Sequence, residues 1–372
     1  MIKVAHILKD MELGGIQTLL LDLLQVYKNK NQEVVFIAIS DGEVLEDFKN
    51  MGGKFYFIPK KIPFFDPFVI FETRKVLIKE KINIIHAHNA TEGIVAYFST
   101  LFLKVKTVLT YHVGFKMNNQ QDAFIFRNLA NKMDLCISPS QTALNELKQS
   151  HVSIEKFKVV YNGVAQQRLL FNKENLAIRK KINISDEEIL IGMVGNFYND
   201  TRNQLLVCEA FFKAQLENEN IKLVFFGGHA NQHLPKAENY LKCKQFCEEK
   251  GIAGKVIFYG LEKNMAAIYE ALDLVLYASR YDTFGMAVVE AITLGKPIMV
   301  NDIPLFKEIT QDGKLAKLYP NNDSEALAKE ISNFAQHFTK NSVSQKEAKD
   351  VYSIEKHSAR LNQLYQELIT KN

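Results

Sequence analysis

The sequence lacks an apolar stretch that could cross a membrane. A spanning helix needs about 20 consecutive apolar residues, and no run in the 372 residues approaches that length. The apolar residues 2–8 are followed at once by Lys9, Asp10 and Glu12, so no secretory signal is visible. The sequence therefore predicts a cytoplasmic protein and leaves open a peripheral position on the cytoplasmic face of the inner membrane.

Cysteine is scarce, and charge of one sign does not dominate. Four cysteines in a long chain without an export signal indicate reduced thiols rather than a disulfide framework. The net charge of +4 is far from the clustered basicity of a nucleic-acid-binding protein, so we expect no nucleic-acid partner. Residues 1–165 hold 20 Lys and Arg against 16 Asp and Glu, while the remainder holds 26 of each. Such an excess suits contact with anionic lipid, and a chance fluctuation of four charges explains it equally well.

Tandem repeats and low-complexity segments are also absent, and a length of 372 residues predicts two domains. In both halves, apolar strand patterns alternate with helical periodicity, which is typical of α/β proteins with doubly wound parallel sheets. Strands are predicted at residues 2–8, 33–40, 54–58, 82–86, 106–111, 135–138, 159–161, 189–194, 222–226, 256–259, 274–278 and 297–300. Helices are predicted at residues 16–27, 43–51, 69–81, 92–103, 123–132, 142–149, 204–216, 236–250, 285–294, 324–337, 344–351 and 354–369. The turn at Asn162 and Gly163, which no apolar periodicity crosses, sets the domain boundary near residue 166.

Residues 273–300 combine the features of a ligand site. A buried strand leads through a polar loop with Asp282 into an apolar helix that begins near Gly285. Ligands of open parallel sheets bind at the carboxyl ends of strands, and the N–H groups at a helix start favour an anion such as phosphate. Asp282 and Glu290 lie on either side of this helix start. Two acids placed in this way can hold different hydroxyls of one ligand whose phosphates rest on the helix end.

The same stretch resembles a known family signature. Phe284, Gly285, Glu290 and the LGKP of residues 294–297 resemble the E-x7-E signature of the retaining nucleotide-sugar glycosyltransferases of family 4, of the bacterial polysaccharide type. The resemblance implies the glycosyltransferase-B architecture, in which two Rossmann-like doubly wound domains face each other across a cleft. Asp282 stands where the family has a glutamate close to hydroxyls of the transferred sugar, so the shorter side chain puts the identity of the sugar in question.

The domain limits follow from the same resemblance. It implies an acceptor-binding domain of residues 1–166 and a donor-binding domain of residues 167–352. The C-terminal helix within residues 353–372 resembles the helix that crosses back onto the first domain in this architecture.

The resemblance also assigns roles in the donor site. Thr283, Phe284 and the N–H groups of Gly285 and Met286 would line the donor, and those N–H groups would stabilise the leaving diphosphate. Glu290 would take the ribose hydroxyls, and Asp282 the hydroxyls of the sugar.

A cation is expected on the loop after the strand at residues 189–194. Arg202 falls where the family has a lysine that holds the diphosphate, and Asn196, directly after Gly195, stands where the family has an arginine. One fixed cation therefore replaces two, and Arg280 and Lys296 are candidates for the second. Gly260 ends a further strand, after which the family places the loop beside the nucleotide base.

Two elements of the first half complete the predicted site. Gly14 and Gly15 lie between a strand and a helix and resemble the family's GG loop near the donor phosphates and the acceptor; a plain tight turn is the alternative. His112 ends a strand and resembles the histidine beside the donor sugar, although Val113 separates it from Gly114; a hydrogen-bonded core histidine is the alternative.

Two sequence patterns raise the question of a metal or a lipid. Metal-like spacings occur in His86 with His88 and in the set His229, His233, Cys243 and Cys247, but we interpret both as packing and expect no metal. Residues 60–68 and 115–132 mix basic and aromatic side chains, as segments at a lipid interface do, with burial of the phenylalanines in the core as the alternative.

The reaction implied by the resemblance is transfer of a hexose-type sugar from a UDP- or GDP-linked donor to an acceptor hydroxyl with retention of configuration. No metal or other cofactor is expected, and the expected acceptor is a glycan of the bacterial surface, lipid-linked during its synthesis. Three alternatives remain open: a nucleotide-sugar 2-epimerase of the same architecture, a glycosyl phosphorylase with pyridoxal phosphate, and an inactive protein that binds and stabilises a partner transferase.

Overall fold

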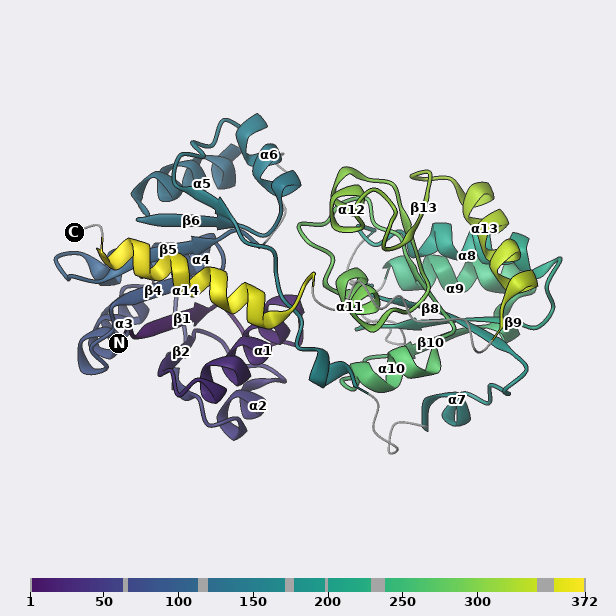
Figure 1. The fold of residues 1–372 in the computed structure, drawn as a ribbon, viewed down its shortest axis with the longest axis horizontal. Helices are drawn as coiled ribbons and strands as arrows, with labels where there is room; N and C mark the ends of the chain where they lie inside the picture. The colour runs from purple at the N-terminus through teal and green to yellow at the C-terminus, as the bar shows by residue number, and fades with distance from the viewer. Residues whose placement is uncertain are drawn as a thin grey trace. The chain divides into compact units, whose positions relative to one another are not determined.

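A computed structural model describes residues 2–62, 66–112, 120–170, 177–197, 200–228, 238–339 and 351–370. The chain divides into two compact units, which Figure 1 shows with their elements labelled. Unit 1 comprises Met1–Ala165 and Tyr352–Asn372, and unit 2 comprises Gln166–Val351. Each unit is described by itself below.

Unit 1 contains a seven-stranded parallel sheet in the order β3-β2-β1-β4-β5-β6-β7. Its strands are β1 (Val4–Leu8), β2 (Val34–Ala38), β3 (Lys54–Phe57), β4 (Ile84–Ala87), β5 (Lys106–Thr110), β6 (Leu135–Ser138) and β7 (Phe157–Val159). Its helices are α1 (Gly15–Asn29), α2 (Leu45–Asn50), α3 (Pro67–Lys79), α4 (Ala90–Thr100), α5 (Gln120–Lys132), α6 (Gln141–Gln149) and α14 (Ile354–Thr370).

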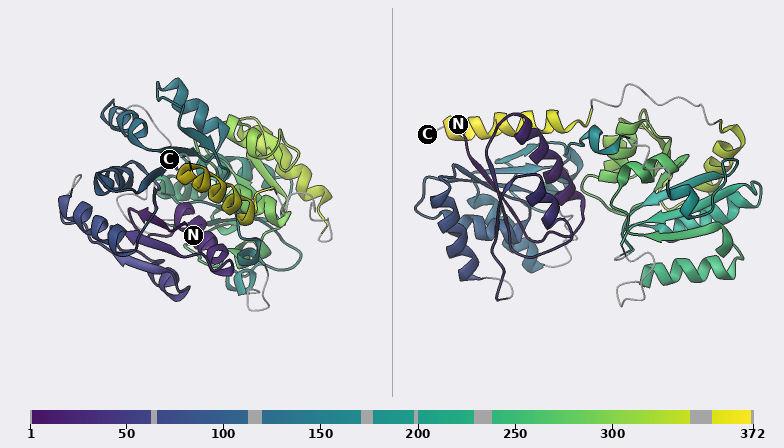
Figure 2. Two further views of the ribbon diagram at one scale, coloured as in Figure 1. Left: turned by 60° about the vertical axis from the view of Figure 1, so that its left-hand side comes forward. Right: turned by 90° about the horizontal axis from the view of Figure 1, so that it is seen from below.

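Both faces of this sheet are covered. Every residue of β1, β2 and β4 is buried, and successive residues alternate between the two faces. Ala5 and Ile7 join one apolar cluster, while Val4 and Leu8 join the other, which also contains Leu364 of α14. Figure 2 shows α14 along one face of the sheet. The doubly wound arrangement follows because strands that are apolar on both sides need a layer of helices on each face.

The C-terminal segment returns to unit 1 through a close backbone contact. Val164 donates its N–H to the Tyr352 carbonyl at 2.8 Å and accepts from the Ile354 N–H at 3.1 Å. A Cβ atom on Gly163 would lie 2.6 Å from the Ile354 Cα atom. Glycine is therefore required in the Asn-Gly turn, because any side chain would separate the two backbones.

Unit 2 contains a six-stranded parallel sheet in the order β10-β9-β8-β11-β12-β13. Its strands are β8 (Ile189–Val194), β9 (Ile221–Phe226), β10 (Val256–Gly260), β11 (Leu274–Tyr277), β12 (Ile298–Asn301) and β13 (Lys317–Tyr319). Its helices are η1 (Gln166–Leu169), α7 (Ala177–Lys181), α8 (Gln204–Gln215), α9 (Glu238–Glu249), η3 (Ala253–Lys255), α10 (Met265–Ala271), α11 (Met286–Leu294), α12 (Pro304–Ile309) and α13 (Ser324–His337).

The predicted fold class, two Rossmann-like α/β domains with parallel sheets, is confirmed. Strand β13 was not predicted from the sequence, because its three residues, one of them an exposed lysine, form a pattern too short to indicate a strand. The strand predicted at residues 159–161 begins two residues earlier, as Phe157–Val159. Most of the helix predicted at residues 344–351 lies outside the described residues.

The remaining compositional expectations concern thiols and membrane spans. All four cysteines are buried and free. Among the described residues, no helix is both long enough and apolar enough to cross a membrane.

Candidate functional site

Gly285 and Asp282 determine the backbone conformation at the start of α11. Gly285 has φ of 74° and ψ of 61°, in the left-handed region, and a Cβ atom on it would lie 3.0 Å from Phe306 Cε1. Asp282 Oδ1 accepts hydrogen bonds from the N–H groups of Thr283 at 2.8 Å and Phe284 at 3.3 Å. The next N–H groups, those at the start of α11, have no partner within the helix because the preceding turn is missing. N–H groups of this kind can bind an anion, and the predicted anion site concerns these groups.

Arg202 is brought beside this helix start by two connected loops. The loops after β8 and β11, which are neighbours in the sheet, pair through an isolated bridge between Arg202 and Ser279. Arg202 Nη1 donates to Asp282 Oδ2 at 2.7 Å and to Ser279 Oγ at 3.0 Å. Tyr277 OH also donates to Asp282 Oδ2, at 3.1 Å. Because the sheet order reverses between β8 and β11, these residues occupy the usual ligand position of an open parallel sheet.

The charge of Arg202 is secured by its surroundings. Burial lowers the pKa of this guanidinium, but the charge of Asp282, the interaction with Tyr277 and the hydrogen bond to Asp282 together outweigh burial, so the pKa lies above its usual value. Burial also raises the pKa of Tyr277, which keeps that hydroxyl protonated as a donor to Asp282. The site therefore carries a permanent cation beside the helix start.

Glu290 is buried and fixed through both carboxylate oxygens. It is 4% exposed, and its Oε1 accepts from Arg168 Nη2 at 2.8 Å. Its Oε2 accepts from Tyr269 OH at 2.9 Å. Burial and the Glu290 charge both raise the pKa of Tyr269, so the phenol remains a donor. Because a carboxylate offers about four acceptor positions, Glu290 retains capacity for two ligand hydroxyls.

Sequence reasoning missed Arg168 and Tyr269. Arg168 belongs to η1, which directly follows the boundary between the units, and it is 122 residues from Glu290 in the sequence. Tyr269 is on α10 and is fully buried. Neither residue belongs to a recognisable local pattern, so only the tertiary structure reveals their contacts.

Backbone groups line the carboxyl ends of the neighbouring strands. The Gly195 N–H donates to Phe226 O and the Gly227 N–H donates to Gly260 O, both at 2.8 Å. Gly227 has φ of +154°, and a Cβ atom on it would lie 2.3 Å from Gly195 O. The ends of β8, β9 and β10 are thus joined by backbone contacts that leave no space for a side chain.

Asn196 has a structural contact that the sequence did not suggest. Its Oδ1 accepts from the Gly228 N–H at 2.6 Å, and its own carbonyl accepts from Gln204 Nε2 at 3.1 Å. Asn196 therefore ties the loop after β8 to the loop after β9 and to α8.

The two candidates for a second cation are placed differently from the prediction. Lys296 follows the C-terminal end of α11, where its Nζ donates to Leu272 O at 3.1 Å, so it lies at the end of the helix opposite Gly285. That candidate is wrong. Arg280 pairs with Asp200 at 2.9 Å on the surface. Arg168, which pairs with Glu290 of α11 at 2.8 Å, is a further cation that the sequence analysis did not name.

The predicted residues of unit 1 lie at the carboxyl ends of its central strands. Gly14 is the N-cap of α1, with an extended backbone at φ of −158°, and Gly15 begins the helix. His112 follows β5. Glu92, in the first turn of α4, was not predicted; its Oε1 accepts from the Lys9 N–H at 2.9 Å, and burial raises the pKa of its carboxyl. Val113 and Gly114 of the same motif lie outside the described residues.

His112 is the end of a chain of histidines. His88 Nδ1 contacts His112 Nε2 at 3.1 Å, and His88 Nε2 contacts His6 Nδ1 at 2.9 Å. His86 Nδ1 bonds Tyr365 OH and its Nε2 bonds Thr110 Oγ1, both at 2.6 Å. Burial is the main cause that lowers the pKa of each of these histidines, to about 3 for His6. The chain is therefore neutral and joined by hydrogen bonds.

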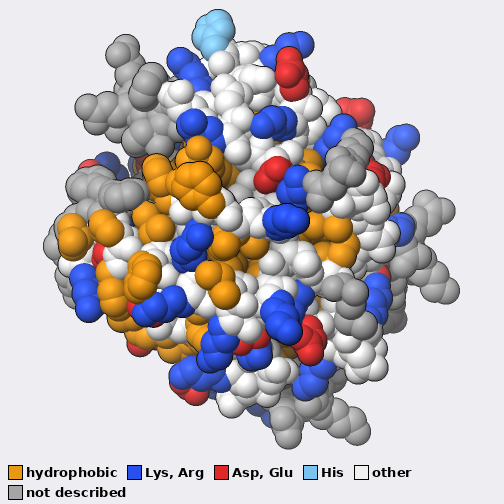
Figure 3. Space-filling model, turned by 90° about the vertical axis from the view of Figure 1, so that its left-hand side faces the viewer, with side chains coloured by type: hydrophobic (Ala, Val, Ile, Leu, Met, Phe, Trp, Pro, Cys, Tyr) orange, Lys and Arg blue, Asp and Glu red, His pale blue; other side chains and the backbone are white. Residues whose placement is uncertain are grey.

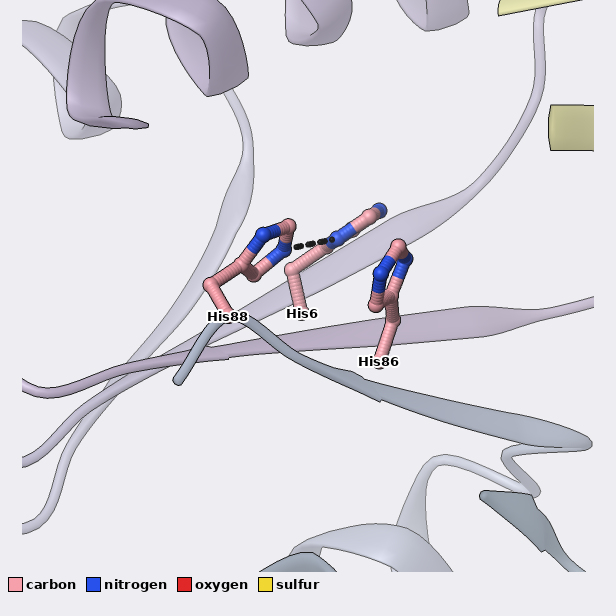
Figure 4. A group of neighbouring side chains, drawn as sticks. All are labelled: His6, His86 and His88. Carbon is pink, nitrogen blue, oxygen red and sulfur yellow. Dashed lines mark hydrogen bonds between the residues drawn. The ribbon is translucent and has the colours of Figure 1, made fainter. Parts of the chain in front are cut away.

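His6 supplies the third member of a possible metal set with His86 and His88. One nitrogen of each ring lies within 4.8 Å of the others, and Figure 4 shows the three side chains side by side. His86 uses both nitrogens in short bonds to hydroxyls, and the His88 ring stacks on both others at interplanar angles of 22° and 25°. Lone pairs of stacked rings do not converge on one ion, so the geometry favours packing. In the other set, His229 and His233 lie outside the described residues.

The structure is that of a two-domain α/β protein in which, within unit 2, Arg202 pairs with Asp282 before α11 and Arg168 pairs with Glu290 of α11. Residues 13–168 match the model described as Glycosyltransferase Family 4, and residues 174–350 match that described as Glycosyl transferases group 1. The chain belongs to the glycosyltransferases of the glycosyltransferase-B architecture.

Individual relatives are distant. The N-acetyl-alpha-D-glucosaminyl L-malate synthase of Bacillus anthracis is 24% identical over 265 residues, which cover 68% of this chain and 65% of that protein, slightly less than two thirds. The UDP-Gal:alpha-D-GlcNAc-diphosphoundecaprenol alpha-1,3-galactosyltransferase of Escherichia coli is 23% identical over 316 residues, covering 81% of this chain and 80% of that protein. The crystal structure of Anabaena HepE in complex with UDP-glucose has a TM-score of 0.84 and 18% identity, covering both chains fully. At this identity the structural likeness shows the fold alone.

Proposed function

We propose that the protein transfers a hexose-type sugar from a nucleotide-diphosphate donor, UDP- or GDP-linked, to an acceptor hydroxyl with retention of configuration. The observation that carries the proposal is the position of Arg202 beside the start of α11. Glu290, in the same helix, is buried, with only 4% of its surface exposed. A cation and free N–H groups suit a diphosphate, and a fixed carboxylate suits a ribose diol.

The leaving group is stabilised by charge. When the bond between the sugar C1 and the phosphate oxygen breaks, negative charge grows on the diphosphate. The N–H groups of Gly285 and Met286 and the Arg202 guanidinium are the donors we assign to that charge, and fixed donors are worth most where charge develops. Thr283 and Phe284 belong to the same loop and would line the donor.

The acceptor hydroxyl would attack C1 from the face that the diphosphate leaves. A new C1–O bond forms on that face, and the acceptor proton passes to the departing phosphate oxygen. This scheme retains configuration without the pair of carboxylates that retaining glycosidases use. Asp282 would hold hydroxyls of the sugar, and neutral His112, with Gly14 and Gly15, would meet the sugar and acceptor from unit 1. Metal is not required by this donor set.

We assign the acceptor to the lipid-linked glycans from which bacterial surface polysaccharides are made. The Escherichia coli relative is named for a diphosphoundecaprenol acceptor. Such an acceptor would place the enzyme on the cytoplasmic face of the membrane, as a peripheral protein.

A thermal-shift panel of nucleoside diphosphates and nucleotide sugars tests the donor, because a ligand of the native state raises stability with the logarithm of its concentration over its Kd. The best ligand should lose about 10- to 100-fold in affinity with Arg202→Gln, the cost of a hydrogen bond to a charged group. Glu290→Gln should weaken nucleotides but not inorganic diphosphate. Asp200→Asn, at the surface partner of Arg280, is the matched control and should bind normally.

Turnover separates the remaining alternatives. Product from donor and acceptor together, with the anomeric centre retained by NMR, supports transfer. Donor conversion without acceptor would indicate the epimerase, and nucleotide binding without turnover over a broad acceptor panel would indicate the inactive partner protein.

A further inference from the structure

The outward face of α3 carries apolar and basic side chains. Phe68, Phe71, Lys75, Ile78 and Lys79 recur at helical spacing and share one face of the helix. Phe71 and Ile78 are each 57% exposed, and Phe68 is 37% exposed. The opposite face is buried in the core of unit 1 through Val69, Thr73, Val76 and Leu77. Phe71 and Ile78 therefore do not belong to the core cluster that Val69, Val76 and Leu77 join.

The end of α4 extends this surface. Arg74 Nη1 donates to Ser99 O at 3.2 Å and to Leu101 O at 2.6 Å, which fixes the end of α4 beside α3. Phe98 is 41% exposed and Phe102 is 101% exposed. Phe102 has φ of 64°, in the left-handed region, which costs a bulky residue about 1 kcal/mol or more. A strained, fully exposed phenylalanine indicates a role in binding rather than in folding.

We name this surface the α3–α4 face, defined by Phe68, Phe71, Ile78, Phe98 and Phe102 with the lysines between and around them. Figure 3 looks at the end of unit 1 that carries α3, and it shows hydrophobic side chains gathered with Lys and Arg side chains set among them. A patch of this kind on a protein marks an interaction site.

The acidic residues near this face already have hydrogen-bond or ion-pair partners within the protein. Asp66 is buried and accepts from the N–H groups of Lys61, Ile62 and Phe68. Glu80 is buried and pairs with Lys54. Glu72 pairs with Lys75 at 2.8 Å. Besides Lys75, the side chains of Lys61, Lys79, Lys81 and Lys104 are exposed, so lysines outnumber the acidic residues and the α3–α4 face presents a net positive charge.

The lysines of this face favour a lipid partner over a protein partner. Lys61 Nζ lies 3.9 Å from the ring centre of Phe68, and Lys75 Nζ lies 4.4 Å from that of Phe71. Lysine is depleted from the buried centre of protein interfaces because its ammonium must be desolvated. At an anionic bilayer the rings enter the boundary of the acyl chains while the flexible lysines reach the headgroups.

We propose that the α3–α4 face docks the protein on a membrane that contains anionic lipid. Each basic residue near such a surface contributes about fivefold in affinity, from about 1 kcal/mol per charge. The proposal extends the function proposed above, since it would hold the enzyme where a lipid-linked acceptor lies, but its test needs neither donor nor acceptor.

The test is cosedimentation of the full chain with vesicles, in the absence of nucleotide. We expect binding to vesicles of phosphatidylcholine mixed with phosphatidylglycerol, little binding to phosphatidylcholine alone, and weaker binding at high salt. Phe71→Ser with Phe102→Ser should weaken binding at least about tenfold, since two exposed rings lose their apolar contact. Lys79→Glu with Lys104→Glu should weaken it by at least as much. Leu216→Ser in unit 2, where Leu216 is 66% exposed, is the matched control and should bind as the unchanged protein does.

Three results would overturn the proposal. The first is no binding to the anionic vesicles, and the second is equal loss of binding in Leu216→Ser. The third is a dimer in size-exclusion chromatography that Phe71→Ser with Phe102→Ser dissociates, which would assign the face to a second copy of the chain. Unchanged circular dichroism and thermal unfolding of each variant exclude misfolding as a cause.

Discussion

Arg202 and Asp282 are joined by a 2.7 Å hydrogen bond between Nη1 and Oδ2, although 80 residues separate them. Arg202, the cation that the sequence predicted for the diphosphate, is thus paired with the acid assigned to the sugar. A diphosphate that binds there must share Arg202 with Asp282, so the two assignments are physically coupled.

This coupling predicts opposite effects of one substitution. Asp282→Asn should strengthen binding of UDP or GDP by about threefold to tenfold, because Arg202 loses a competing charge while the amide oxygen still accepts from the Thr283 N–H. Transfer of sugar should fall, because the contact between residue 282 and the hydroxyls of the transferred sugar weakens. Calorimetric titration with the nucleoside diphosphate measures the first effect, the rate of sugar transfer to an acceptor measures the second, and Asp200→Asn serves as control. Weaker binding of the diphosphate itself would contradict the prediction.

Arg168 should act as a positioning residue for Glu290. Arg168→Gln should raise the KM for the donor about tenfold with little change in kcat, because the carboxylate loses the bond that orients it toward the ribose. Arg168→Lys should restore part of the affinity, since it returns the charge without the planar guanidinium geometry. Steady-state kinetics of both variants and of Tyr269→Phe provide the measurement. A fall in kcat at constant KM would instead place Arg168 at the reacting bond.

Gly285 should be among the least replaceable glycines of unit 2. Gly285→Ala should lower the free energy of unfolding by about 1–3 kcal/mol, since it adds a Cβ atom at positive φ against Phe306. Gly254→Ala is the control, because a Cβ atom there would meet nothing within 4 Å. Urea unfolding of the two variants gives the comparison, and equal stability of both would show that the α11 start tolerates a side chain.

Unit 1 should lose stability in mild acid. Burial lowers the pKa of His6 to about 3 and that of His357 to about 4, against 6.5 for the unfolded chain. The unfolded state therefore binds more protons at intermediate pH, and the stabilisation is complete above about pH 6.5 and is lost as the pH falls toward 4. Within that pH range, each such histidine should lower the free energy of unfolding by about 1.4 kcal/mol for each unit by which the pH falls.

Hydrogen exchange in the full chain measures this effect in unit 1 alone, from peptides of β1, β4 and β5 between pH 7 and pH 5. His6→Gln should reduce the acid-induced loss of protection, and His337→Gln, at an exposed position on α13, should not. A loss of protection that is the same in both variants would assign the acid sensitivity to other groups.

Much of the fold was predictable because its signals are local. Apolar runs of four to six residues, such as 34–38 and 189–194, indicate strands that are buried on both faces. The helical patterns between these runs indicate that the strands pair in parallel. The glycine at position 285 and the acids at 282 and 290 marked the helix start in the same way. Strand β13 and the short helix α10 were missed, because three to seven residues give no periodicity to detect.

The sequence alone determined the two α/β domains, the residue types at the ends of their strands and the family to which the signature of residues 282–297 points. The tertiary structure decided which of those residues meet: Arg202 with Asp282, Arg168 with Glu290, and His6 with His88. It also removed Lys296 from the helix start. The physical reason is distance along the chain. Periodicity governs neighbours within a helix or strand, whereas partners 80 to 122 residues apart meet only through the order in which parallel strands assemble.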